Sequence, residues 1–363
     1  MTPKFNANVD SKSLIVATAS VYSGVGRYAK LLYDLGLANS LVLYRKSSSD
    51  NNGGFENVVK PDRGGYSKNT LLSLAFHTNW SKHVKRFDWV HVTTPDFFNL
   101  VRYNENMVGT VHDLFTMESI ITRKAYSLRY RIFIKYNLEF LYRLKGVIAI
   151  SNVTKKELDI MFPGLEIQVI HNWEDDTFKS RSREYCREIL ALPKDKKLIL
   201  QVSSTEPRKN LDFVSRIMKG LGTQYILVRI GAHYQNLDEL RPSKVITFQN
   251  VDDDIYPLFF NACDVFITTS VAEGFNRPLV QAIKSNCQIV ASNTEVHREI
   301  MKGKGVLLEV DDPNQWIEKI KDICNGSLNT MSVSTQYELS EYYSKKRATE
   351  EIRSFYTKVL DNY

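Results

Sequence analysis

Short apolar runs rich in valine and isoleucine recur along the chain, and many are followed by a segment with the apolar spacing of a helix. This alternation is typical of βαβ units, in which helices cover both faces of a parallel sheet. It predicts an α/β fold. The runs that we expect to form strands lie at 14–19, 40–44, 89–94, 107–113, 146–151, 168–171, 197–203, 225–231, 245–251, 264–270, 288–293 and 305–310.

A polar, basic and irregular stretch divides these runs into two series. It reads WEDDTFKSRSREY, and we place a hinge near residues 172–184. Two such series predict two Rossmann-like domains, at 1–173 and 174–335, whose parallel sheets face a central cleft. The final stretch, 336–363, has helical spacing without glycine or proline. It predicts one long terminal helix that could cross back to the first domain.

The charge of the chain indicates an anionic partner. Its 363 residues carry a formal net charge of +7, which favours nucleic acid, a phospholipid surface or phosphorylated small molecules. No stretch approaches the ~20 apolar residues of a membrane-spanning helix, and the first dozen residues lack the apolar core of a secretory signal. The four cysteines stand far apart and form no CxxC pair. We therefore expect a cytoplasmic protein.

The most informative segment is 270–282, which directly follows the run at 264–270. Pro278 suits the first turn of a helix, and Asn276 suits the cap before it. Backbone N–H groups at such a helix start could hold a diphosphate oxygen or sugar hydroxyls, and Glu273 would face the same place. Gln281, one turn into the helix, could reach a ribose hydroxyl. On spacing alone, an acidic residue ahead of an ordinary capped helix is an equal alternative.

A basic loop follows the run at 197–203 and ends in Arg208, Lys209 and Asn210. Because the helix macrodipole disfavours cations at a helix start, an anionic ligand explains this pair better than helix stability does. A guanidinium can hold two phosphate oxygens while an ammonium acts as a point charge. Together they could stabilise a departing diphosphate. The alternative is a solvated basic turn.

The first apolar run is followed by Gly24-Val-Gly26-Arg27-Tyr28-Ala29, which satisfies the pattern GxGxxA. A dinucleotide site normally requires a tight turn after the strand and an acidic residue at the end of the second strand. Here several residues precede Gly24, and the second run ends in Tyr44-Arg45-Lys46. An NADP-dependent oxidoreductase with a phosphate site at Arg45 is therefore the alternative function.

His112 ends another run of the first domain, where parallel sheets present their ligand-binding loops. A lone histidine is as often a structural residue as a functional one. The other histidines show no metal-ligand spacing with cysteine or carboxylate, so we expect no metal site. The absence of a GxSxG elbow and of a Walker A sequence removes the main support for serine hydrolases and P-loop ATPases.

Together these segments resemble the retaining, GT-B-fold glycosyltransferases of glycosyltransferase family four. The family's glutamate motif, EGFGLPxxEA, is matched by EGFNRPLVQA from Glu273 to Ala282, and EPRKN at 206–210 resembles the phosphate-binding loop of a mannosyltransferase-like subgroup. Further similarity lies in AISNVTKKEL, VIHNWED and ACDVFITTS, in the family's order. The resemblance covers nearly the whole chain, from Leu14 to Leu360.

The resemblance implies a metal-independent hexosyltransferase. It would move a hexose from a nucleotide-diphosphate sugar, GDP-mannose or a UDP-sugar, to a hydroxyl of a glycan or lipid-linked acceptor, with no cofactor besides the donor. It implies that Glu273 contacts the donor sugar and that Arg208 and Lys209 bind the diphosphate. His112 would lie beside the sugar. The other implied donor contacts are Gly24, Gly26, Val251, Gly274, Phe275, Asn276 and Gln281.

Two departures from the family pattern concern the donor site. Gln281 replaces the second carboxylate of the motif and would bind ribose more weakly. Asn276 stands where the family usually has glycine, which narrows the backbone freedom beside the sugar. A catalytically degenerate homologue that still binds sugar nucleotides therefore remains an alternative.

Two basic and aromatic segments, 80–86 and 122–136, could rest on an anionic lipid surface. They favour a lipid-linked acceptor and peripheral attachment to the cytoplasmic face of a membrane. A partly buried helix with solvated charges is the alternative for the second segment. The basic residues are distributed over both domains without a nucleic-acid-binding module, so we expect no nucleic acid partner.

Overall fold

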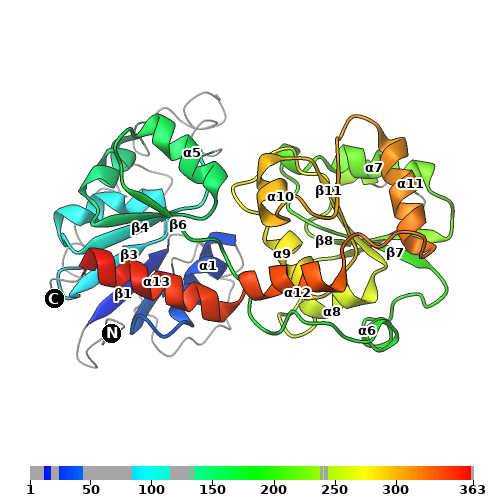
Figure 1. Cartoon of the computed structure of the whole chain (residues 1–363), viewed down its shortest axis with the longest axis horizontal. Helices are drawn as coiled ribbons and strands as arrows, with labels where there is room; N and C mark the ends of the chain where they lie inside the picture. Colours follow the sequence, from blue (N-terminus) through cyan, green and yellow to red (C-terminus); the bar gives the residue numbers. More distant parts are fainter. Residues whose placement is uncertain are drawn as a thin grey trace. The chain divides into compact units, whose positions relative to one another are not determined.

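The structure is a computed structural model that describes residues 12–17, 24–43, 84–114, 132, 135–237, 240 and 244–360. The chain divides into two compact units. Unit 1 contains Met1–Asn172 together with Ala348–Tyr363, and unit 2 contains Trp173–Arg347 (Figure 1). Each unit is described below by itself.

Unit 1 is built on a six-stranded sheet of order β2-β1-β3-β4-β5-β6, in which every pairing is parallel. All six strands overlap apolar runs of the sequence, which confirms the α/β prediction for this unit. Their bounds are β1 (Ser13–Ala17), β2 (Ser40–Leu43), β3 (Trp89–Val92), β4 (Met107–Val111), β5 (Gly146–Ala149) and β6 (Ile167–Val169). The described helices of this unit are α1 (Gly24–Tyr33), η1 (Pro95–Arg102), η2 (Glu139–Arg143), α5 (Asn152–Met161) and α13 (Lys345–Leu360), of which α13 joins unit 1 from Ala348.

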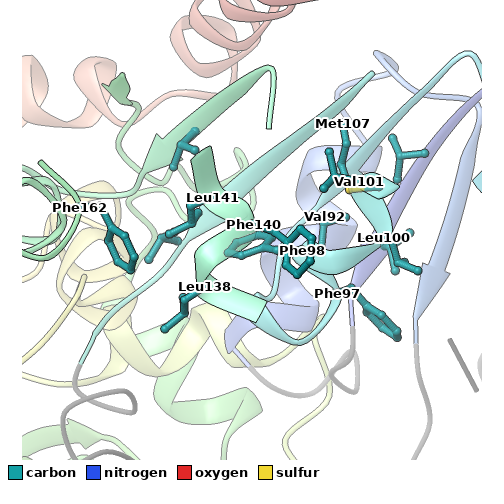
Figure 2. Packing of buried hydrophobic residues seen from close by; sticks show 14 of the residues in the cluster. Val92, Phe97, Phe98, Leu100, Val101, Met107, Leu138, Phe140, Leu141 and Phe162 are labelled. Atoms are coloured by element: carbon teal, nitrogen blue, oxygen red, sulfur yellow. The ribbon is translucent and has the colours of Figure 1, made fainter. Parts of the chain in front are cut away.

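Alternate residues of each strand send their side chains to opposite faces of this sheet. On one face, Val92 and Met107 belong to an apolar cluster with residues of the 3₁₀ helices η1 and η2, and Phe162 beyond α5 extends this cluster on the side of Leu138 and Leu141 (Figure 2). On the other face, His91 and Gly146 meet side chains of α13. Both faces are therefore covered, as near-continuous apolar strands require.

Unit 2 contains a second six-stranded parallel sheet, of order β12-β11-β10-β7-β8-β9. The strands are β7 (Lys197–Val202), β8 (Tyr225–Ile230), β9 (Val245–Phe248), β10 (Val265–Thr268), β11 (Ile289–Ser292) and β12 (Val306–Leu308). The chain winds outward from β7 in one direction to β9 and, after returning, in the other direction from β10 to β12. This is the doubly wound order of dinucleotide-binding sheets, and its switch point lies between β7 and β10.

Helices cover both faces of the second sheet. Phe213 and Ile217 of α7 and Trp316 of α11 pack on the face that carries Ile199 and Leu227. On the other face, Phe260 of α8 contacts Phe266 of β10. The helices of unit 2 are α6 (Arg183–Ile189), η3 (Pro207–Lys209), α7 (Leu211–Gly220), η4 (Gln235–Leu237), α8 (Tyr256–Ala262), α9 (Arg277–Lys284), α10 (Glu295–Ile300), α11 (Pro313–Cys324) and α12 (Val333–Tyr342).

The prediction of a single terminal helix is wrong, because the chain forms two helices there, α12 and α13. Tyr343, between them, is buried in unit 2, where its hydroxyl donates to the carbonyl of Ile300 at 3.0 Å. The hydroxyl of Ser344 then accepts from the backbone N–H of Arg347 at 3.3 Å, which begins the new helix as a cap does. A tertiary anchor therefore interrupts a segment whose local pattern is continuously helical.

The described residues show three further features that bear on the sequence predictions. All four cysteines are buried and unpaired. No described helix combines the length and the apolar composition that crossing a membrane requires. Within the same residues, histidine, cysteine and carboxylate side chains form no group of three that could hold a metal ion.

Candidate functional site

The switch point of unit 2 brings together two loops that lie about 60 residues apart in sequence. One follows β7 and carries Arg208 and Lys209; the other follows β10 and carries Glu273. Backbone and side-chain hydrogen bonds join them: the N–H of Val271 donates to the carbonyl of Arg208 at 2.8 Å, and the hydroxyl of Thr269 donates to the carbonyl of Lys209 at 3.0 Å. Hydrogen bonds thus join the two loops that carry the predicted site residues into one local structure.

Arg208, Lys209 and Glu273 form an ion cluster at this point. Both cations pair with the Glu273 carboxylate, Arg208 with one oxygen and Lys209 with the other, the latter at 2.5 Å. The carboxylate side chain is only 3% exposed, whereas those of Lys209 and Arg208 are 15% and 28% exposed. A buried anion is therefore covered by two cations that solvent still reaches.

The charge state of Glu273 follows from this arrangement. Burial alone would raise its pKa, but the charges of Lys209 and Arg208, with hydrogen bonds from Lys209 and Ser270, outweigh burial and lower the pKa below its ordinary value. The carboxylate is therefore ionised at neutral pH. With two adjacent cations, the cluster has a net charge of +1 before Glu206 is counted, which pairs with Arg208 at 2.7 Å from an exposed position.

The local chain geometry explains why the basic loop reaches this place. Pro207 begins the single turn η3, and Asn210 ends it with a φ of +52°, in the left-handed region that asparagine tolerates better than most residues. The backbone then enters α7 directly. A second hydrogen bond, from Arg208 Nη1 to the carbonyl of Ala272 at 3.1 Å, fixes the guanidinium against the glutamate loop.

The start of α9 has the capped form expected from the sequence. The Asn276 side chain accepts from the N–H of Leu279 at 3.2 Å, and Pro278 occupies the first turn. The backbone N–H groups of Gly274 and Asn276, two buried residues, donate no hydrogen bond to any other described residue. Unpaired buried donors at a helix start are suited to an anion or to hydroxyl oxygens.

Arg277, the first residue of α9, already pairs with a carboxylate of the protein, so its charge is compensated before any anion binds. Its Nη2 lies 2.6 Å from a carboxylate oxygen of Glu174, which is buried in the segment that enters unit 2. This pair compensates a cation that the helix dipole would otherwise disfavour. The sequence gives no sign of the pairing, because 103 positions separate the two residues and only the fold joins them.

A histidine that the sequence analysis did not assign lies directly behind the glutamate loop. His297 of α10 is completely buried; its Nε2 is 2.9 Å from the Asn276 amide nitrogen and its Nδ1 is 2.8 Å from the carbonyl of Ser292. Its position just past the carboxyl end of β11 is the one signal that could have marked it. In the sequence, His297 is one of the histidines without metal-ligand spacing.

The other residues of unit 2 that are predicted to contact the donor are Gln281, Phe275 and Val251. Gln281 is buried in α9, and its carbonyl oxygen accepts from the Tyr256 hydroxyl at 2.8 Å. Phe275 is half-buried, with its ring 6.1 Å from that of Tyr343. Val251 is half-buried in the loop between β9 and α8. The side-chain oxygen of Gln281 thus already accepts a hydrogen bond within the protein. Val251 lies in a loop that follows the end of a strand.

The predicted residues of unit 1 gather around α1 and β4. Gly24 begins α1 and Gly26 is buried in its first turn, so the glycines lie inside the helix. The His112 ring packs edge-on against Tyr28 of α1, with 4.7 Å between ring centroids. The Tyr28 hydroxyl in turn lies 3.2 Å from that of Thr110 on β4. The structure therefore groups Gly24, Gly26 and His112 in one unit and the other candidates in the other unit.

Two predictions concern residues of which the structure describes little. The segment 80–86 is described only from 84, and of 122–136 only 132, 135 and 136 are described. Arg45, on which the NADP alternative depends, lies outside the described residues. These predictions are not tested by the fold.

Comparison with known protein families gives one match on each unit. The family "Glycosyltransferase Family 4" matches residues 25–178, and the family "Glycosyl transferases group 1" matches residues 182–345. Neither describes an oxidoreductase.

Individual relatives are distant. The chain is 21% identical over 232 residues to D-inositol 3-phosphate glycosyltransferase of Mycolicibacterium smegmatis, and 22% identical over 232 residues to the O-antigen chain mannosyltransferase RfbU of Salmonella typhimurium. Each match covers 60% of this chain but only 51% and 61% of the respective relative. The comparison thus spans between half and two thirds of these relatives' own length.

Solved structures show the same fold over nearly the whole chain. A sucrose-phosphate synthase of Thermosynechococcus elongatus superposes with a TM-score of 0.80 at 14% identity, covering 97% of this chain and 100% of that one. HepE of Anabaena, in complex with UDP-glucose, superposes with a TM-score of 0.77 at 16% identity, covering 96% and 99%. With one glycosyltransferase family matched on each unit and a parallel six-stranded sheet in each, the chain belongs to the GT-B glycosyltransferases related to family four.

Proposed function

We propose that this protein transfers a hexose from a nucleotide-diphosphate sugar to a hydroxyl group of a glycan or lipid-linked acceptor. The observation that carries the proposal is the ion cluster at the switch point of unit 2. Arg208 and Lys209 meet Glu273 where a doubly wound sheet binds its ligand, and unpaired backbone donors lie beside them.

The diphosphate would be held by positive charge from the chain itself. The partly exposed heads of Arg208 and Lys209 supply charge-assisted hydrogen bonds, and the N–H groups of Gly274 and Asn276 supply neutral ones. As the bond to the sugar breaks, negative charge grows on the diphosphate, and these groups stabilise it. Such an arrangement gives the leaving group its stabilisation without a metal ion, and we propose a metal-independent reaction.

Glu273 would bind the sugar. An ionised carboxylate offers about four lone-pair sites, and hydrogen bonds from Arg208, Lys209 and Ser270 use three of them. The remaining capacity suits a sugar hydroxyl. Because the carboxylate is buried and held from two sides, it would fix the hexose in one orientation with little loss of side-chain entropy on binding.

The reaction that this site would support retains the configuration at the anomeric carbon. The acceptor hydroxyl would attack from the face that the diphosphate leaves. The bond from the anomeric carbon to the diphosphate oxygen breaks, a bond to the acceptor oxygen forms, and the acceptor proton passes to the departing diphosphate. We propose that His112 lies beside the sugar and that Gly24 and Gly26 approach the phosphates from unit 1.

The donor would be GDP-mannose or a UDP-sugar. Support comes from the EPRKN loop, from the mannosyltransferase RfbU among the relatives and from HepE, which binds UDP-glucose in its solved structure. A panel of nucleotide sugars, assayed for binding and slow donor hydrolysis, identifies the donor.

The test of the function compares the wild type with Arg208→Ala and Lys209→Ala. Each variant should lose ~10²- to 10³-fold in transfer or donor-hydrolysis rate, because a positioned charge stabiliser is removed. Lys194→Ala is the control, since Lys194 pairs with Glu188 at an exposed site of the same unit. Near-normal turnover in both site variants would refute their role, and a wild type that binds nucleotide sugars without turnover would be a degenerate homologue.

We also propose that unit 1 attaches to an anionic membrane, where it would meet a lipid-linked acceptor. Tyr142, 55% exposed, packs edge-on against Phe162 and is followed in sequence by the exposed Arg143. Ile160, 74% exposed, and Met161 lie just before Phe162. Aromatic and aliphatic groups beside cations suit a lipid interface. Co-sedimentation with vesicles should increase with their phosphatidylserine content; binding independent of that content would contradict the proposal.

A further inference from the structure

We infer that His297 is a positioning residue for the donor: through Asn276 it holds the glutamate loop and the first turn of α9, and it does so only as a neutral ring. The inference rests on the proposed function, since it concerns the same donor site. His297 itself touches no substrate in this scheme, because its side chain is completely buried behind the loop.

The proton positions on His297 follow from its partners. Nδ1 lies 2.8 Å from the carbonyl oxygen of Ser292, which can only accept, so Nδ1 carries a proton. Asn276 uses its side-chain oxygen to accept from the N–H of Leu279, so its amide nitrogen must be the atom that faces His297. An amide nitrogen only donates. Nε2 must therefore accept, and the ring is neutral with its proton on Nδ1.

The second donor of Asn276 confirms this orientation. Its amide nitrogen also lies 2.9 Å from the hydroxyl of Thr268, the last residue of β10. Reversing the amide would turn its NH2 group toward the N–H of Leu279, so that two donors oppose each other, and would place its oxygen against Nε2, which could then donate only in a charged ring. All the polar atoms of the Asn276 side chain are thus engaged, and they connect the end of β10, the start of α9 and His297.

The network holds the glutamate loop at both of its ends. The Ser292 hydroxyl donates to the carbonyl of Ser270, three residues before Glu273, while His297 holds Asn276, three residues after it. The two holding groups lie on either side of the β11–α10 turn, Ser292 at the end of β11 and His297 in α10, and the Thr294 side chain in this turn accepts from the N–H of His297. The position of the Glu273 backbone is therefore set from behind by one rigid corner.

A charged His297 would break this arrangement. Its Nε2–H would point at the amide N–H group of Asn276 over 2.9 Å, so two donors would oppose each other in a buried site. Burial lowers the pKa of His297, the carbonyl of Ser292 and the charge of Glu273 raise it, Lys209 lowers it, and the net pKa lies below the ordinary value. Glu273 and Lys209 are the charged groups among the described residues that act on the ring.

Two variants separate the two contacts of the ring. In His297→Gln the longer side chain can place its oxygen where Nε2 was, which keeps the bond from Asn276 and loses the bond to Ser292. In His297→Asn the shorter side chain can place its nitrogen where Nδ1 was, which keeps the bond to Ser292 and leaves Asn276 unpaired. If the contact with Asn276 positions the donor site, only the asparagine variant should be impaired.

The experiment measures UDP and GDP binding by calorimetry for the wild type and both variants, with thermal unfolding measured in parallel. We expect His297→Gln to bind within about twofold of the wild type and His297→Asn to bind roughly tenfold more weakly, the effect of one lost buried hydrogen bond. A merely structural role would lower the unfolding temperature of both variants and leave their nucleotide affinities equal. Equal affinities therefore overturn the inference.

A second measurement determines the protonation state of the His297 ring directly in the wild type. Nitrogen NMR of the wild type at pH 6, with the His297 signal assigned by its absence from the His297→Gln spectrum, should show a neutral ring protonated on Nδ1. A charged ring or a proton on Nε2 overturns the inference. Failure of the proposed function is distinguishable: without a donor site the wild type itself would bind neither UDP nor GDP, and a degenerate homologue would bind them without turning over any nucleotide sugar.

Discussion

The Tyr356 hydroxyl lies 2.6 Å from Nδ1 of His91, although 265 positions separate the two residues in sequence. Both are buried, and the other ring nitrogen of His91 lies 2.7 Å from the Thr110 hydroxyl. Burial lowers the pKa of His91 to about 3, and the charge of His112 acts in the same direction. The ring is therefore neutral, and α13 is attached to the sheet of unit 1 through a polar contact within an apolar interface.

Removing the hydroxyl in Tyr356→Phe should lower the free energy of unfolding by about 1–3 kcal/mol, because a buried ring nitrogen of His91 loses its partner. Urea denaturation of the variant and the wild type measures the change. Tyr337→Phe is the matched control, since Tyr337 is 69% exposed on α12. An equal effect of the two substitutions would show that the buried contact contributes nothing.

A second prediction concerns the closest approach of α13 to the sheet. A methyl group at Gly146 would lie 2.8 Å from the Phe355 ring and 3.0 Å from Val359. Gly146→Ala should therefore displace α13 and destabilise the protein by about 1–3 kcal/mol. Gly24 provides the contrast, because a methyl group there meets no described atom within 4 Å.

Gly24→Ala should leave stability unchanged or raise it by roughly 0.5–1 kcal/mol, since alanine is the better helix former. If Gly24 is required for donor binding, as we propose, the same variant loses nucleotide affinity while keeping its fold. Calorimetry and denaturation of this one variant therefore separate a functional from a conformational need for glycine. Unchanged affinity would remove Gly24 from the donor site.

Two buried arginines of unit 2 differ in whether they have a counter-charge. Arg187 pairs with the buried Asp264 at 2.8 Å and donates to three carbonyl oxygens. Arg229 is completely buried, donates to the carbonyl of Ala232, and its Nε and Nη2 find no partner among the described residues. Burial lowers the pKa of Arg229, which marks the unfavourable environment of its charge.

Arg229→Met should therefore leave the free energy of unfolding unchanged or raise it by up to about 4 kcal/mol, whereas Arg187→Met should lower it by about 3 kcal/mol because Asp264 loses its buried partner. Guanidinium chloride unfolding of both variants gives the comparison. If Arg229→Met is the more destabilised of the two, the guanidinium is stabilised by groups that its contacts do not reveal.

The acid stability of unit 2 depends on Glu273. Its native pKa is lowered, whereas an unfolded glutamate titrates near ~4.3. The stabilisation is fully present above that unfolded value and is lost as the pH falls through it toward the native pKa. The stability advantage of the wild type over Glu273→Gln should be constant from about pH 6 to 5 and should shrink below about pH 4. Urea unfolding across this range measures it, and an advantage that grows in acid would show a raised pKa instead.

Much of the fold was predictable because local chemistry determines it. The central strands of both sheets are buried along their length, so they remain visible as apolar runs. The capped start of α9 follows from Asn276 and Pro278. The sequence places a basic loop and a glutamate loop directly after two predicted strands, and the resemblance assigns both loops to the donor site. The structure adds that Arg208 and Lys209 of the first loop pair with Glu273 of the second. These features depend on neighbours in sequence or on a common strand edge.

What sequence reasoning missed depends on contacts between distant positions. The break before α13 arises because Tyr343 is anchored to Ile300, and a periodic pattern contains no trace of such an anchor. His297 gained its role from Asn276, 21 positions away in the chain. Neither Tyr343 nor His297 differs from its neighbours in any local sequence pattern, so only the three-dimensional structure could identify their contacts.

The assignment of α13 to unit 1 has a consequence for biosynthesis. The strands of unit 1 leave the ribosome well before Tyr356 does, so Nδ1 of His91 acquires its partner, the Tyr356 hydroxyl, only after α13 has been translated. All of unit 2 is synthesised after His91 and before Tyr356, so it can fold while the nascent chain is still growing. Unit 1, whose sheet is synthesised first, is thus completed last. A chain that terminates before Tyr356 would therefore have a destabilised unit 1.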